Sequence, residues 1–286
     1  MKTLAGGFRF AEAPRWHDGK LWFSDIFANA VMTVDEQGQV DHVFSLPEGE
    51  LPCGLGFLPD GSVLVASMRS QLIYGFRASE GVRVHADLSD LAAPGMDGFG
   101  GLNDMVVDDR GRAYVGSMGN DPHDAPRPLT GSGNLILVEP DGSARIVAEE
   151  MDAPNGPCIT GDGTTYIVAE FPAQRLIGFR RTEDGSLTDR RVWADLSPGS
   201  ADGIAVDSAG GVWTASPLQG ECRRVTEGGA VTDVIDLGEK IPLACALGGA
   251  DGRTLFVLSA VGGLEALQSF TSTSDIDVVR VEVPAP

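Results

Sequence analysis

The sequence repeats one short β-strand six times. Each copy starts just after a glycine, usually within Asp-Gly, continues with apolar or β-branched residues, and stops at a small or acidic residue. The six end positions are Asp25, Ser67, Ser117, Ala169, Ser216 and Ser259. The intervals between them are 42, 50, 52, 47 and 43 residues. A period in the forties that is built from strands and turns is typical of β-propeller blades.

Further strand patterns recur around each copy. One lies before the glycine, as at 54–60, one follows the end position, as at 72–77, and a more polar one completes the unit, as at 40–46. No stretch has the periodicity of a long amphipathic helix. The chain also has 38 glycines, as many tight turns require. We therefore predict an all-β fold, a six-bladed propeller with four antiparallel strands per blade, formed by residues 1–286 as a single domain.

The last repeat shows how the ring should close. Residues 275–283 match a third strand, and no residues remain for a fourth. The residues before Glu12 are free to supply it, which would place both ends of the chain in one blade and leave no open sheet edge.

The charge and cysteine patterns exclude several classes of function. A formal net charge of -20 disfavours binding to nucleic acid or to an anionic membrane. Residues 1–10 lack the features of a signal peptide, and no apolar run reaches the length of a membrane span. The four cysteines form no CxxC pair, so we predict buried thiols rather than zinc or redox chemistry. We expect a cytoplasmic monomer or small homo-oligomer that acts on a small molecule.

Four turns each carry an oxygen-bearing side chain just before the inner strand of a predicted blade. These residues are Glu12 in blade one, Asn103 in blade three, Asn155 in blade four and Asp202 in blade five. The inner strands of a propeller line its central channel, so these four positions should ring one mouth of it. The equivalent places in blades two and six hold Cys53 and the pair Ala244 and Cys245.

Two carboxylates and two amide oxygens are the ligands of a hard divalent cation. Calcium is the first choice, and Mg²⁺, Mn²⁺ or Zn²⁺ remain open. None of the four histidines lies at these positions, which disfavours a typical zinc site. Asn and Asp beside glycine are also ordinary turn formers, so each position alone has a structural explanation. Glu12 is different, because a glutamate that faces a channel would be a costly buried charge without a cation.

The same segments resemble the senescence-marker-protein/gluconolactonase/luciferin-regenerating-enzyme family over nearly the whole chain. The resemblance rests on Glu12-Ala-Pro-Arg-Trp, Asn103-Asp104, Asn155-Gly156 and Asp202-Gly203-Ile-Ala-Val-Asp, in this order. It implies a six-bladed propeller that hydrolyses lactones, or in some relatives esters or organophosphates, with one catalytic divalent metal in the channel. Carried over, it makes Glu12, Asn155 and Asp202 metal ligands and Asn103 a fourth ligand or a substrate contact. It also makes Asp202 the candidate general base.

The chain departs from the family pattern at two places. Sugar-lactone hydrolases of the family typically carry an arginine at the position of Gly101, and phosphotriesterase relatives use a histidine in the last blade, where this chain has none. Apolar residues near the mouth suggest a less polar substrate, unless they serve to pack loops together; they are Met68, Met96, Phe99, Met118 and Phe171.

These patterns lead to one main hypothesis, the metal-dependent hydrolysis of a lactone or ester that is less polar than a sugar lactone. We expect Asn103, Met118, Glu170 and Phe171 to contact substrate, and Asp104 and Glu170 are also candidates to support the metal ligands. Either Asp202 or a water activated by the cation supplies the base. The alternatives are isomerisation or dehydration through an enolate at the same site, and a non-catalytic binding module with a structural metal.

One connection is much longer than the others. Residues 117–135 are rich in proline and glycine and poor in apolar residues. We predict a loop over one face, which serves either as a lid or as an insertion without a role in the reaction.

Overall fold

The structure is a computed structural model that describes residues 1–93, 101–119, 132–171, 173–269 and 271–286. Met96, Phe99 and most of the connection at 117–135 lie outside the described residues. The predictions made for them therefore stay predictions.

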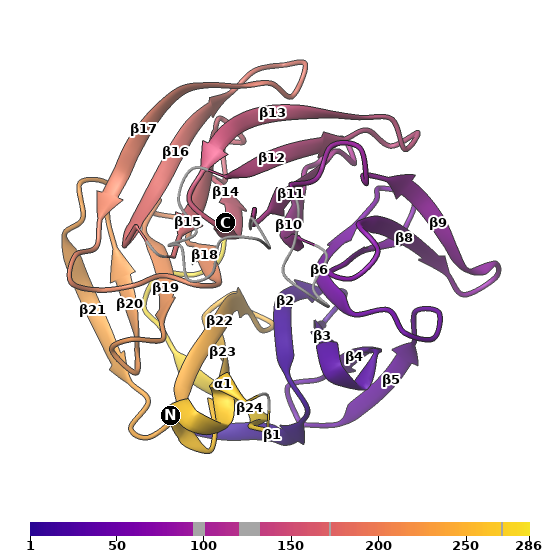
Figure 1. The fold of residues 1–286 in the computed structure, drawn as a ribbon. Coiled ribbons are helices and arrows are strands. Elements are labelled where there is room, and N and C mark those ends of the chain that lie inside the picture. The colour runs from indigo at the N-terminus through magenta and orange to yellow at the C-terminus, as the bar shows by residue number, and fades with distance from the viewer. Residues whose placement is uncertain (94–100, 120–131, 172, 270) are drawn as a thin grey trace.

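Six antiparallel sheets of four strands each are arranged around a central axis (Figure 1). Their inner strands β2, β6, β10, β14, β18 and β22 contact one another in a closed ring. The predicted six-bladed propeller is thereby confirmed. So is its closure, because β1 from the N-terminal end pairs with β24 as the outer strand of the last blade.

The strands follow the chain from the inside of each blade outwards. Blade one consists of β2 (Ala11–His17), β3 (Lys20–Asp25), β4 (Ala30–Val34) and β5 (Val40–Phe44). Blade two consists of β6 (Pro52–Phe57), β7 (Val63–Ser67), β8 (Leu72–Arg77) and β9 (Gly81–Asp87). Blade three consists of β10 (Leu102–Val107), β11 (Ala113–Ser117), β12 (Gly133–Val138) and β13 (Ala144–Met151).

The other three blades repeat this order. Blade four consists of β14 (Pro154–Ile159), β15 (Thr165–Glu170), β16 (Arg175–Arg181) and β17 (Leu187–Asp195). Blade five consists of β18 (Ile204–Val206), β19 (Val212–Ser216), β20 (Glu221–Val225) and β21 (Val231–Asp236). Blade six consists of β22 (Ile241–Gly248), β23 (Thr254–Val261), β24 (Thr273–Arg280) and β1 (Lys2–Phe8).

In the part of the chain that the structure describes, helix occurs in two short elements at the ends of second strands. They are the 3₁₀ turn η1 (Ile26–Ala28) and the helix α1 (Gly263–Gln268). Within the described ranges, no helix has the length and apolar character needed to cross a membrane.

The hydrophobic core is divided among the blade interfaces. Each of the six interfaces between neighbouring blades contains one buried apolar cluster. Between blades three and four, for example, Tyr114 and Tyr166 lie with ring centroids 5.2 Å apart. Burial of this apolar surface is the main force that holds the blades together.

The Asp-Gly repeats of the sequence form the turns between first and second strands. In blade two, Asp60 Oδ1 accepts the N–H of Ser62, and in blade four Asp162 Oδ1 accepts the N–H of Thr164. The glycines between them, Gly61 and Gly163, have φ angles of 82° and 72°. Only glycine adopts this left-handed conformation at little cost, which explains the repeat.

Glycines also allow the inner strands of neighbouring blades to approach closely at their entry ends. A Cβ atom at Gly54 would lie 2.6 Å from the backbone nitrogen of Met105, and one at Gly156 would lie 2.5 Å from Gly203 Cα. A Cβ atom at Gly203 would lie 2.5 Å from Ala244 Cβ. At these three interfaces the blades therefore pack closely beside Asn103, Asn155 and Asp202.

We expect Gly54→Ala to lower the free energy of unfolding by about 2 kcal/mol, because the added methyl group would force β6 away from the β10 backbone. Gly75→Ala is the matched control in β8, because a Cβ atom there meets its nearest neighbour, His85 Cβ, at 3.7 Å. Urea denaturation of both variants measures the difference. Equal midpoints for Gly54→Ala and the wild type would contradict the close approach.

Candidate metal centre and active site

The candidate residues lie at irregular points in the inner strands. The pairing of β2 with β3 shifts by one residue between Glu12 and Arg15, and the pairing of β10 with β11 shifts between Leu102 and Met105. The pairing of β14 with β15 shifts in the same way just after Pro154. Such β-bulges leave one residue out of the ladder and re-aim the side chains beside it.

The bulges explain one difference from the sequence-based expectation. Glu12, Asn103 and Asn155 were expected to precede the inner strands, but the ladders begin before the bulges, so these residues lie inside β2, β10 and β14. Asp202 does precede β18, and its N–H donates to the carbonyl oxygen of Ala215 on the second strand at 2.9 Å.

The two carboxylates of the predicted centre lie close enough to repel one another. Burial raises the pKa of Glu12 well above its usual value, and the charges of Asp202 and Asp104 raise it further. Burial raises the pKa of Asp202 to about 7, again with a contribution from Asp104. Both residues are half-buried, so the cluster lies deep among protein atoms but keeps some accessible surface.

Asn155 orients Asp202. Its Oδ1 accepts the N–H of Gly156 at 2.8 Å, and its side-chain amide donates to the Asp202 carboxylate, which lowers the pKa of Asp202. Glu12 is fixed in a similar way, because its Oε2 accepts the N–H of Ala13 at 2.9 Å. One oxygen of Glu12 is thus held by the backbone.

Asn103 is 8% exposed and has Cys53 as its neighbour. The Cys53 thiol donates to Asn103 Oδ1 at 3.3 Å. Burial raises the pKa of this thiol well above its usual value, and the nearby carboxylates add to the effect, so the thiol stays neutral. Blade two therefore contributes a neutral thiol, which orients the amide of Asn103.

Asp104, predicted as a supporting residue, is buried beside the cluster. Its Oδ1 accepts the N–H of Met105 at 2.8 Å and Nη2 of Arg15 at 2.9 Å. The sequence pattern indicates no role for Arg15 or for Cys53 in this arrangement. Arg15 could have been noticed, because it is a cation within the Glu12 motif of an acidic chain.

The structure does not bring Glu170 into this group. Glu170 is fully buried at the end of β15, where Arg175 Nε donates to it at 2.6 Å and Arg190 Nη2 at 3.1 Å. The N–H of Asp152 is a third donor, at 3.0 Å. The Glu170 carboxylate therefore belongs to an ion-pair network that ties together the end of blade four.

Met118 and Phe171 follow the ends of β11 and β15 and are both half-buried. The N–H of Met118 donates to the carbonyl oxygen of Gly101 at 2.7 Å. Met68 packs beside Cys53 in an apolar cluster with Ile26 and Leu51. Met68 thus has the packing role that the sequence analysis gave as the alternative to substrate contact.

The donor set fits a divalent cation in its chemistry. The carboxylates of Glu12 and Asp202 both have raised pKa values, and a bound cation would favour their charged forms. Among the residues that the structure describes, no three His, Cys, Asp or Glu side chains could hold a metal ion by themselves. A centre at Glu12 and Asp202 therefore has to include amide oxygens, as the sequence pattern predicts.

In the cation-free protein, Asp202 should make folding less favourable as the pH rises from about 4 to about 7. Its pKa is about 7 in the folded state, against an ordinary value of 3.8. Between these two pH values the folded state therefore binds a proton that the unfolded state has already lost. The folded state loses this advantage as the pH rises and the proton is released. The upper limit of this loss is about 4 kcal/mol.

Urea denaturation at pH 5 and pH 8 with chelator present measures this effect. We expect the wild type to lose more stability between the two values than Asp202→Asn does. Equal losses in the two proteins would show that Asp202 is not in a repulsive environment.

The chain is similar to known proteins over most of its length. The model of the SMP-30/Gluconolactonase/LRE-like region matches residues 10–261. A 6-deoxy-6-sulfogluconolactonase from Pseudomonas putida is 29% identical over 282 residues, which are 96% of this chain and 91% of the relative. Pentonolactonase XacC from Haloferax volcanii is 27% identical over 260 residues, which are 89% and 82% of the two chains. The crystal structure of regucalcin from Agrobacterium tumefaciens, described as a calcium-binding protein, superposes with a TM-score of 0.79 at 22% identity and covers 100% of this chain and 95% of that one.

Proposed function

Because the chain belongs to the SMP-30/Gluconolactonase/LRE-like family, we propose that it is a lactone hydrolase that depends on one divalent cation. Two relatives that match most of its length are named as lactonases, which supports a small-molecule lactone as the substrate class. The observation that carries the proposal is the position of two half-buried carboxylates, Glu12 and Asp202, at the entry ends of β2 and β18, where the charge of Asp202 acts on Glu12.

Glu12, Asn155 and Asp202 would hold the cation, and Asn103 would either complete the site or contact the substrate. Ca²⁺ is the first choice, because all of these donors are oxygens and one structural relative is described as calcium-binding. Mg²⁺, Mn²⁺ and Zn²⁺ are the other candidates. When bound, the cation would supply positive charge that polarises the lactone carbonyl and favours the negative charge that develops on its oxygen.

Asp202 would accept the proton of the attacking water. A carboxylate beside a dication is a weak base, because the cation favours its charged form. Asp202 would therefore use the oxygen that does not contact the cation. The amide of Asn155 keeps the carboxylate in a fixed orientation for this step. Cys53 does the same for Asn103, whose amide would contact the substrate.

The relatives' names favour a sugar-derived lactone over the less polar substrate that Gly101, Met118 and Phe171 suggested. A panel of an aldonolactone, a γ-lactone with an alkyl chain and an aryl ester, assayed with Ca²⁺, tests the proposed class. We expect the highest kcat/KM for one of the two lactones. Hydrolysis of the aryl ester alone, or of none of the three, would contradict the proposal.

A further inference from the structure

Arg15 extends from the inner strand of blade one to that of blade three. Its Nη2 donates to Asp104 Oδ1 at 2.9 Å and to the carbonyl oxygen of Met105, and its Nη1 donates to the carbonyl oxygen of Pro14 at 2.8 Å. The side chains of Arg15 and Asp104 are 19% and 7% exposed. Three acceptors on two strands therefore hold the guanidinium in one place.

The charges around the candidate metal centre form a small group. Within the described part of the chain, the charged side chains that act on Glu12 are Asp202, Asp104 and Arg15. Asp104 is also the charge that acts on Asp202. Three carboxylates and one guanidinium carry a formal charge of minus two, which one divalent cation would neutralise.

We propose that Arg15 is a counter-ion that neutralises the charge of Asp104. The net charge of the candidate centre then matches that of one divalent cation. This inference rests on the cation site of the proposed function. Arg15 is a positioning residue, because it acts through Asp104 and electrostatically rather than by touching substrate. Without Arg15 the group would carry minus three and attract cations more strongly. Without Asp104 it would carry minus one, and the guanidinium would repel cations.

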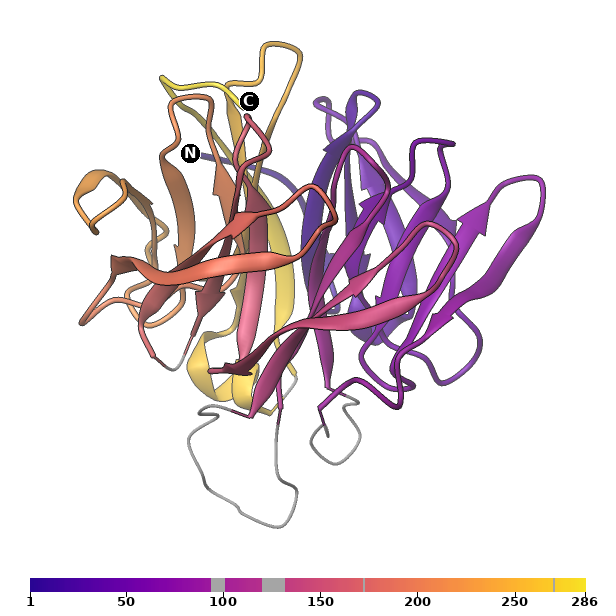
Figure 2. The same cartoon turned by 90° about the horizontal axis from the view of Figure 1, so that it is seen from above.

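Arg15 also lines a cavity nearer the opposite end of the axis. Together with Trp16, Val206 and Leu247, it lines a cavity of about 460 Å³ at the exit ends of the inner strands. Ala285 and Pro286 line the same cavity, and the C-terminus lies at this end of the molecule (Figure 2). Arg15 therefore both lines this cavity and contacts Asp104 beside the candidate centre.

The proposal predicts changes of opposite sign for two neighbouring variants. Calorimetric titration of chelator-treated protein with Ca²⁺ and with Tb³⁺ measures them. Arg15→Gln should bind Ca²⁺ about tenfold more tightly, and Tb³⁺ about thirtyfold, because the Coulomb energy scales with the charge of the ion. Asp104→Asn should weaken both by similar factors. The double variant Arg15→Gln/Asp104→Asn restores the charge of minus two and should bind both ions within about threefold of the wild type.

Two further variants separate charge from other effects. Arg15→Lys keeps the charge and should bind like the wild type. Arg83→Gln removes an arginine that is 60% exposed on the outer strand β9, and it should leave both affinities unchanged. If Arg15→Gln fails to fold because Asp104 is left unpaired, the double variant should still bind Ca²⁺ about tenfold more tightly than Asp104→Asn.

The outcomes distinguish this inference from the proposed function. Wild-type affinity in Arg15→Gln, or equal affinities in the double variant and Asp104→Asn, would overturn the role of Arg15 alone. A wild-type protein that binds neither ion would overturn the cation site and this inference with it.

Discussion

Asp202→Asn should lower kcat/KM for lactone hydrolysis about 1,000-fold, within the range that a lost general base typically costs. Asparagine has the same shape and keeps an oxygen that can face the cation, but it cannot accept a proton. The amide of Asn155 can still donate to that oxygen, so the local geometry should persist. Steady-state kinetics with saturating Ca²⁺ measures the loss, and calorimetry shows whether the variant still binds the cation.

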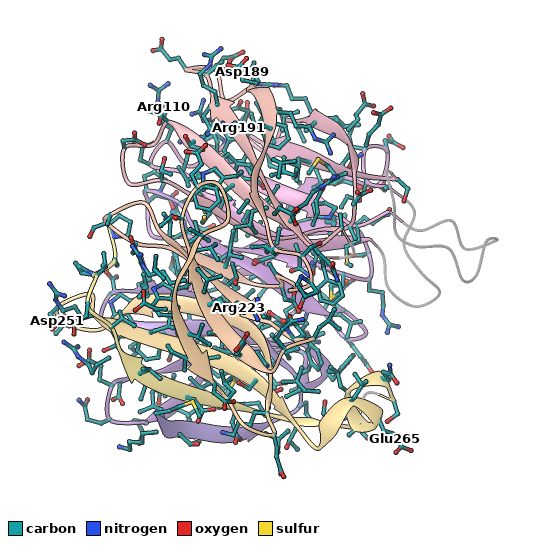
Figure 3. The ribbon with its side chains drawn as sticks, turned by 90° about the vertical axis from the view of Figure 1, so that its left-hand side faces the viewer. Arg110, Asp189, Arg191, Arg223, Asp251 and Glu265 are labelled. Carbon is teal, nitrogen blue, oxygen red and sulfur yellow. The ribbon has the colours of Figure 1, made fainter. Side chains whose placement is uncertain are left out.

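The control for this variant is Asp189→Asn. Asp189 lies on the outer strand of blade four, where it pairs with Arg180, and Figure 3 shows it at the periphery of the molecule. Its replacement removes the same charge and should leave kcat/KM unchanged. If Asp202→Asn retains the cation and hydrolyses lactone at the wild-type rate, Asp202 is not the base.

Glu12→Gln should weaken Ca²⁺ binding about 100-fold, because the number of charged ligands largely sets the affinity of a calcium site. Activity at low Ca²⁺ should disappear and return in part at high Ca²⁺. This recovery would distinguish a lost ligand from a lost base, since added cation cannot rescue Asp202→Asn. Glutamine should also fold well here, because its side-chain oxygen can still accept the N–H of Ala13.

Glu265→Gln is the matched control for Glu12→Gln. Glu265 lies on the helix α1, and Figure 3 shows it at the edge of the molecule. It is exposed to solvent, and its replacement should change neither Ca²⁺ affinity nor activity. Unchanged Ca²⁺ affinity in Glu12→Gln would exclude Glu12 as a ligand.

The fold could be predicted from the sequence because its information is local and repeated. A strand that starts after a glycine and ends at a small or acidic residue appears in every blade, and the turn that Asp60 or Asp162 forms needs only adjacent residues. The closure by β1 followed from counting strands in the last repeat. Such repeats fix both the number of blades and the order of strands within each.

The contacts within the site could not be predicted in the same way. The bond from Arg15 to Asp104 joins residues 89 positions apart, and that from Cys53 to Asn103 joins residues 50 apart. Both depend on the direction in which a bulge points a side chain, and a shift of one residue in register would reverse it. The sequence therefore indicates which residues could form a cation site but not which groups orient them.

Glu170 shows that the partners of a buried side chain are a second feature that the sequence pattern does not reveal. Its place at the end of a second strand suggested the channel mouth, next to Phe171. The arginines that occupy its carboxylate come from β16 and β17, two strands that the sequence pattern describes only as apolar or polar. A buried glutamate with such partners is stable without a cation, whereas Glu12 has the opposite electrostatic surroundings.

The most direct test is to remove and restore the cation while following lactone hydrolysis. Protein treated with chelator and then freed of it should be inactive. Its rate should rise with added Ca²⁺ to a plateau that is reached at one bound ion per chain. Full activity in the chelator-treated protein, with no bound cation and no response to Ca²⁺, Mg²⁺, Mn²⁺ or Zn²⁺, would contradict a cation-dependent lactonase.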